Sequence, residues 1–193
     1  MPGALNSIPQ DDLPAPQFLD SQVYCEPILL AQPLACVIIT PVEINVLIEE
    51  EFKDCLETGW LRSLAEQVLT LQGVGVEAEL GLVIASQERV RELNRSYRGK
   101  DAPTDVLAFS TLPSVEEPFI LPSDGQLHLG EVIVSYPQAV IQAGEEGHSI
   151  KKEIATLITH GVLHLLGFED ETPELKKQMQ AREQEILSRL GID

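Results

Sequence analysis

Alternating apolar and polar residues predict two strands in the first half of the chain. Residues 42–49 (V-E-I-N-V-L-I-E) and 76–85 (V-E-A-E-L-G-L-V-I-A) switch between apolar and polar with a period close to two. That period places one face of a strand in the core of a domain. Shorter runs at 106–109 and 131–135 predict two further strands.

Apolar residues recur at helical spacing between these strands and after them. A helix over 56–72 is predicted by five such residues, Trp60, Leu61, Leu64, Val68 and Leu71. Further helical patterns begin after residues that suit a helix N-terminus, which are Ser86, Ser135, Ser149 and Thr172. Strands interleaved with helices predict an α+β domain with one mixed sheet of about four strands.

Residues 1–41 differ from the rest of the chain in composition. They hold seven of the thirteen prolines and no Lys or Arg. Proline at that density is incompatible with the interior of a helix or a sheet. We interpret 1–41 as a Pro-rich, mostly disordered N-terminal extension and 42–193 as the folded domain.

The net charge limits the partners that the chain can bind. Asp and Glu number 31 against 13 Lys and Arg, which gives a formal net charge of −18. Such a protein repels polyanions overall, so a nucleic-acid site requires a local basic patch.

The apolar run 28–39 is interrupted by Pro33 and is too short to span a bilayer. Three cysteines without a C-x-x-C pair favour a reducing cytosol. We therefore expect a cytoplasmic protein with no membrane segment.

The strongest chemical pattern is T-H-G-V-L-H-L-L-G-F-E-D at 159–170. His160 and His164 are four residues apart and lie on one face of a helix, one turn from each other. Two imidazoles at that spacing can bind one metal ion, and Zn²⁺ takes neutral imidazole well. Gly167 can end the helix and reverse the chain, so we expect Asp170 to return as the third ligand. A pair of packed core histidines, the alternative, does not explain the glycine stop and the carboxylate after it.

The residue after His160 disfavours one class of metal enzyme. In the metalloprotease pattern H-E-x-x-H, the glutamate is the general base, and here that position is Gly161. Another carboxylate must then orient the water. Glu131, at the predicted start of a strand, is the candidate, and a solvated strand-end glutamate is the alternative interpretation.

Basic residues are concentrated in one short segment of this acidic chain. Five of them fall within twelve positions, Arg89, Arg91, Arg95, Arg98 and Lys100. For Arg89, Arg91 and Arg95, a solvated helix face is as good an explanation as a functional role. Arg98 is predicted to lie beyond the helix, in a turn with Gly99, and loops carry a disproportionate share of sites. Its guanidinium suits a pair of phosphate oxygens, so we expect it to hold phosphate.

Several separated motifs carry a family resemblance. They are L-N at 93–94, Y-R-G-K-D at 97–101, P-T-D-V-L-A-F at 103–109, L-G-E-V-I at 129–133 and the histidine run. Together they resemble the bacterial YbeY family over roughly 42–190. The resemblance implies a single zincin-like domain that holds one Zn²⁺ through three ligands. It also implies a single-strand-specific endoribonuclease that acts on ribosomal particles, in 16S rRNA 3′-end maturation and ribosome quality control.

The chain departs from the family pattern H-G-x-L-H-L-x-G-[YF]-D-H at the third ligand. Asp170 stands where the family has histidine. Zn²⁺ accepts carboxylate oxygen at a similar distance, but the added negative charge leaves water and phosphate less polarised. We predict weaker hydrolysis than in a three-histidine relative, or a site tuned to a different metal. A non-catalytic ribosome-assembly factor with a weakened or structural metal site, and less favourably a metalloprotease, are the alternative functions.

Overall fold

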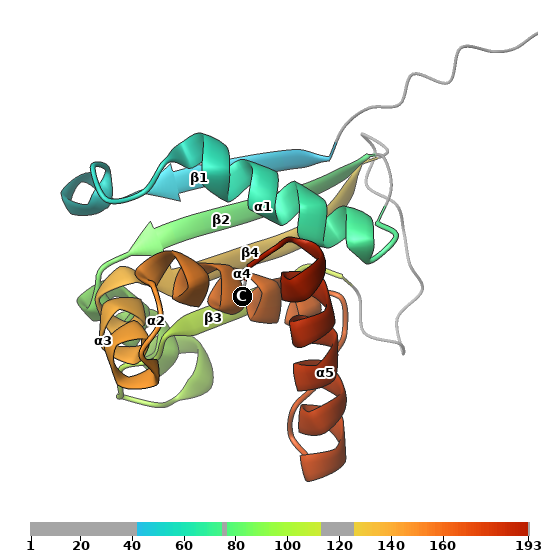
Figure 1. Ribbon diagram of the computed structural model, residues 1–193. Helices are drawn as coiled ribbons and strands as arrows, with labels where there is room; N and C mark the ends of the chain where they lie inside the picture. Colours follow the sequence, from blue (N-terminus) through green and yellow to red (C-terminus); the bar gives the residue numbers. More distant parts are fainter. Residues whose placement is uncertain (1–41, 75–76, 113–125, 193) are drawn as a thin grey trace, which may run out of the picture. The chain divides into compact units, whose positions relative to one another are not determined.

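The domain is organised around one mixed β-sheet. The computed structural model describes residues 42–74, 77–112 and 126–192, so the predicted extension at 1–41 lies outside the described residues. The strands are β1 (Glu43–Ile48), β2 (Ala78–Ala85), β3 (Val106–Ser110) and β4 (Leu127–Ser135). Their order in the sheet is β1-β2-β4-β3 (Figure 1). β2 is parallel to both β1 and β4, whereas the edge strand β3 is antiparallel to β4.

Helices cover both faces of this sheet. The described residues form a short 3-10 helix at Glu50–Phe52 and five α-helices, α1 (Thr58–Leu71), α2 (Gln87–Arg98), α3 (Tyr136–Glu146), α4 (Ile150–Leu165) and α5 (Pro173–Arg189). Buried residues of α1, α4 and α5 form a large apolar cluster against one face. A smaller cluster joins α2 to the other face, through Val90, Val83 and Ile133. The predicted α+β fold with four strands is confirmed.

Local side-chain chemistry sets the start of the two helices that matter most for the site. The Ser149 hydroxyl accepts a hydrogen bond from the Lys152 amide at 3.1 Å, at the start of α4. The Thr172 hydroxyl does the same for the Leu175 amide at 3.2 Å, at the start of α5. Each bond satisfies an amide that has no partner inside its helix.

Two of the differences from the predicted element boundaries affect candidate site residues. β4 begins at Leu127, four residues before the predicted start, because Leu127 and His128 already pair with β2 before a register shift near Leu80. α2 includes Arg98 as its last residue, and Gly99 follows in the left-handed conformation at φ 67°. Arg98 is therefore the end of the helix and not part of the turn beyond it.

Candidate metal centre

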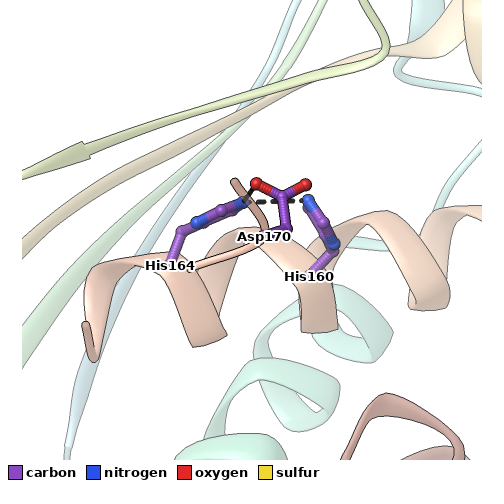
Figure 2. Close-up of side chains that lie close together, drawn as sticks. All are labelled: His160, His164 and Asp170. Carbon is purple, nitrogen blue, oxygen red and sulfur yellow. Dashed lines mark hydrogen bonds and ion pairs between the residues drawn. The ribbon is translucent and has the colours of Figure 1, made fainter. Parts of the chain in front are cut away.

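Helix α4 carries two histidines beside the face that packs on the sheet. Gly161, between them in sequence, is buried against β4, where a Cβ would lie 2.5 Å from Cγ1 of Val132. His160 and His164 project from the flank of the helix, and Figure 2 shows one nitrogen of each ring pointing toward the other ring. Their Nε2 atoms are 3.0 Å apart, and the ring planes are 82° from parallel.

The turn after α4 returns a carboxylate to the histidines. Gly167 has φ 87°, and the amides of Gly167 and Phe168 bond back to the carbonyls of His164 and Leu163 at 3.0 Å each. This reversal places Oδ1 of Asp170 3.9 Å from Nε2 of His164. One ligand atom from each of His160, His164 and Asp170 lies within 4.8 Å of the others (Figure 2). The arrangement predicted from the sequence is present, and the role of these residues as ligands remains a prediction.

The outer nitrogens of both rings are held by hydrogen-bond acceptors. Nδ1 of His160 lies 2.6 Å from Oε1 of Glu183 on α5, and Nδ1 of His164 lies 2.9 Å from the Phe168 carbonyl. An imidazole that donates through Nδ1 carries its lone pair on Nε2 when it is neutral. Two lone pairs therefore face each other across 3.0 Å, an arrangement that only a proton or a cation between them relieves.

The donor set fits a divalent metal ion. Two nitrogens that each lie about 2.0–2.1 Å from one tetrahedral ion are about 3.3 Å apart, close to the Nε2 separation here. Nδ1 bonds to a carboxylate and to a backbone carbonyl are the usual supports of metal-binding histidines. Asp170, with 42% of its side chain exposed, leaves the group open to solvent.

The environment shifts the two histidine pKa values in opposite directions. Burial opposes protonation of His160, but the hydrogen bond and charge of Glu183, together with the charges of Asp170 and Asp105, raise the pKa of His160. Burial and the adjacent His160 lower the pKa of His164, and the positive charge of Arg98 adds to that effect. Glu183 therefore favours the protonated form of His160, whereas burial and His160 favour the neutral form of His164.

The two predicted catalytic residues are placed differently. Arg98 is exposed at the end of α2, and its charge reaches His164. Glu131 is on the opposite face of the sheet from α4, because its neighbour Val132 points to Gly161 and successive strand residues alternate between faces. The Glu131 side chain instead lies over Gly81 of β2. The structure therefore does not bring Glu131 together with the histidines, and its expected role in orienting water there lacks the necessary proximity.

Sequence reasoning missed the carboxylates that surround the histidines. Glu183 lies 23 positions from its partner His160, so no local spacing identifies it. Asp105 belongs to the motif P-T-D-V-L-A-F, where its spacing indicates no role, although its charge acts on His160. Its carboxylate also accepts hydrogen bonds from the Val106 amide at 2.8 Å and from the Gln142 side chain at 2.9 Å.

An α+β domain with two histidines and an aspartate converging at an open position has the donor set of a metal-dependent hydrolase. Comparison with known proteins specifies the family. The YbeY family profile, described as Endoribonuclease YbeY, matches residues 46–191. The chain therefore belongs to the YbeY family, a family of endoribonucleases, which confirms the resemblance seen in its motifs.

Three individual proteins are similar to this chain. An Endoribonuclease YbeY of Dehalococcoides mccartyi is 44% identical over 141 residues, which cover 70% of this chain and 82% of the relative. One from Pelotomaculum thermopropionicum is 45% identical over 135 residues, covering 70% and 87%. The solution structure of TM1509 from Thermotoga maritima is 25% identical, with a TM-score of 0.47, and the match covers 76% of this chain and 91% of that one.

Within the described ranges, the structure contains no helix that is both long enough and apolar enough to cross a membrane.

Proposed function

We propose that this protein is a zinc-dependent endoribonuclease that cleaves single-stranded RNA. Its proposed zinc ligands are His160, His164 and Asp170. The observation that carries the proposal is the pair of Nε2 atoms facing each other at 3.0 Å, with both Nδ1 atoms held by acceptors. By analogy with the family, the proposed substrate is precursor 16S rRNA at its 3′ end, in ribosomal particles of the cytoplasm, with a role in ribosome quality control.

Individual residues of this chain have separate roles in such a reaction. When bound, a divalent ion supplies a Lewis acid that polarises a phosphate and lowers the pKa of water. Arg98, whose charge already reaches His164, binds the scissile phosphate and stabilises the charge that develops on its oxygens. Glu183 holds His160 in the tautomer that presents Nε2.

The charges around the candidate centre indicate the side from which RNA arrives. A groove of about 990 Å³ beside His160 is lined by four carboxylates, those of Asp105, Glu146, Glu153 and Glu183, against Lys152 and Lys176. The net charge of α2 has the opposite sign, because its four arginines, Arg89, Arg91, Arg95 and Arg98, outnumber Glu88 and Glu92. A polyanion is favoured on the α2 side, so we propose that the RNA strand passes the end of α2 at Arg98.

The alternative functions are less consistent with the geometry. A glutamate at position 161, as a metalloprotease requires, would be buried against Val132 and Val106 and not directed at the histidines. A structural metal site is normally closed by four protein ligands, whereas this group offers three and one of them is 42% exposed. Both features favour a catalytic site with an open position.

The proposal is tested by metal content and RNA cleavage measured on the same samples. His160→Ala should lose both the metal and the cleavage of single-stranded rRNA precursors. Arg98→Ala should keep the metal and lose about 10²-fold or more in cleavage, as expected when a donor to the developing charge is removed. Arg189→Ala is the matched control, because Arg189 is an exposed arginine that pairs with Glu185 on α5. The proposal fails if wild type leaves these RNAs intact and all three variants behave as it does.

A substitution of Asp170 tests the third proposed ligand. Asp170→His restores the family's three imidazoles and removes one negative charge from the site, so we expect higher cleavage with zinc content at least equal to that of wild type. A variant with less zinc and less cleavage would show that the carboxylate is the better ligand in this chain.

A further inference from the structure

One aromatic side chain of α2 is held in an exposed position without being part of the core. Tyr97 is 71% exposed, the largest exposed fraction among the large hydrophobic residues that the structure describes. Its ring meets Phe109 of β3 at a centroid distance of 5.1 Å and an interplanar angle of 64°. Phe109 restricts the orientation of the tyrosine, while the exposure leaves a ring face open to solvent.

The surroundings of Tyr97 are suited to a nucleotide. Arg98, the proposed phosphate ligand, is the next residue in the chain. A shallow hollow of about 530 Å³ runs along the same helix and is lined by Tyr97, Leu93, Ser96, Glu92 and Arg89. This lining offers a base an aromatic ring for stacking and polar side chains for hydrogen bonds.

The arginines of α2 separate into two groups. Arg91 is paired with Asp101 at 2.7 Å and Arg89 with Glu49 at 3.6 Å. Arg95 and Arg98 form no ion pair within 42–74, 77–112 and 126–192, and they lie in the last turn of the helix beside Tyr97. The positive charge that remains available to phosphate is therefore concentrated next to the exposed ring.

We propose that Tyr97 is a stacking platform for one unpaired base of the RNA whose backbone is held by Arg98. This inference rests on the proposed endoribonuclease function and adds a residue that selects the substrate. Stacking on an aromatic side chain requires a base with an exposed face, which single strands offer and the interior of a duplex does not. Tyr97 would then contribute to single-strand selectivity.

Binding of short single-stranded RNA, measured by fluorescence anisotropy, tests the proposal. Tyr97→Leu should weaken binding by roughly 5- to 150-fold, the range of one base–aromatic stack. Tyr97→Phe keeps the ring and should bind as wild type does. Ile141→Leu, at an apolar position of α3 that is 47% exposed, is the control for a surface substitution. In cleavage assays Tyr97→Leu should raise KM far more than it lowers kcat.

A scan with RNAs that each lack one base separates stacking from a general loss of binding. Wild type should lose affinity when one particular base is missing, and Tyr97→Leu should be insensitive at that position while its salt dependence stays unchanged. The stacking proposal is overturned if Tyr97→Leu binds intact RNA as tightly as wild type, or if it keeps the wild-type scan profile. Either result leaves wild-type cleavage in place, whereas failure of the proposed function would remove cleavage by wild type itself.

Discussion

The contact between His160 and Glu183 has two opposing effects on metal binding. The carboxylate orients the ring through a 2.6 Å hydrogen bond, which favours a metal at Nε2. It also raises the pKa of His160, against the effect of burial, which favours the proton that competes with the metal. Lowering the pH strengthens the second effect relative to the first, because a larger fraction of His160 then carries the competing proton.

Glu183→Gln separates these effects. At neutral pH the variant should bind Zn²⁺ about 10- to 100-fold more weakly, because the ring loses its charged support. Metal affinity falls as the pH drops through the pKa of His160, and removal of the Glu183 charge lowers that pKa. The acid-induced loss of metal should therefore begin at a lower pH in the variant than in wild type. Titration with a fluorescent zinc competitor between pH 5 and 8 measures both quantities.

Glu185→Gln is the control for this substitution. Glu185 is on the same helix and pairs with Arg182 at 2.6 Å and with Arg189 at 3.2 Å. These exposed pairs contribute little to stability, and they are not part of the histidine group. A variant of Glu185 that changes zinc affinity as much as Glu183→Gln does would contradict a specific role for Glu183.

At the residue scale, the sequence predicts what local spacing determines. His160, His164 and Asp170 were found together because a helical turn and a glycine stop bring them within eleven positions. Glu183 could not be found this way, since it approaches His160 only when α5 packs on α4. The position of Glu131 was also unpredictable, because the face to which a strand residue points depends on which neighbour covers it.

At the element scale, α4 both covers the sheet and carries the histidines, and Gly161 makes this combination possible. A Cβ at this position would lie 2.5 and 3.1 Å from the two methyl groups of Val132 and 3.3 Å from Val106. Neither valine is the flexible end of a long side chain, so the helix itself would have to move. The absence of a side chain therefore sets how close α4 lies to β4.

Gly161→Ala should destabilise the protein by about 1–3 kcal/mol, because overpacking outweighs the higher helix propensity of alanine. The matched control is Gly144→Ala on α3, where a Cβ would meet nothing within 4 Å. At position 144 only the higher helix propensity of alanine acts, and it should raise the free energy of unfolding by about 0.5–1 kcal/mol. Urea unfolding of both variants decides the matter, and equal effects in the same direction would refute the packing argument.

Some element ends were predictable from local residue types. Ser149 and Thr172 begin α4 and α5 as expected, because their hydroxyls bond to amides three residues ahead. The start of β4 was misplaced, since Leu127–Gly130 become a strand through pairing with β2, about fifty residues earlier in the chain. Pairing with a distant strand therefore determined the structure of this segment, although its local sequence pattern resembles a loop.

At the scale of the whole molecule, a net charge of −18 must be reconciled with a polyanionic substrate. Lys152 and Lys176 share the groove beside His160 with four carboxylates, whereas the cations at the end of α2 lie outside that acidic groove. Arg95, Arg98 and Lys100 form no ion pair within the described residues, whereas Arg91 is bound to Asp101 at 2.7 Å. Only about three phosphate contacts are therefore expected from this region.

The salt dependence of RNA binding measures the number of these phosphate contacts. Each phosphate neutralised on a single strand contributes about −0.7 to the slope of log K against log salt, so three cations give a slope of about −2 and a roughly 20-fold loss between 50 and 200 mM KCl. Arg95→Ala and Arg98→Ala should each reduce the slope by about 0.7, while Arg91→Ala should leave it nearly unchanged. A wild-type slope steeper than about −4 would require cations outside α2 and the turn after it, and would place the RNA on a different surface. A slope near −2 that responds to Arg95 and Arg98 would mean that a few aligned charges are sufficient, because stacking and the metal centre provide the remaining affinity.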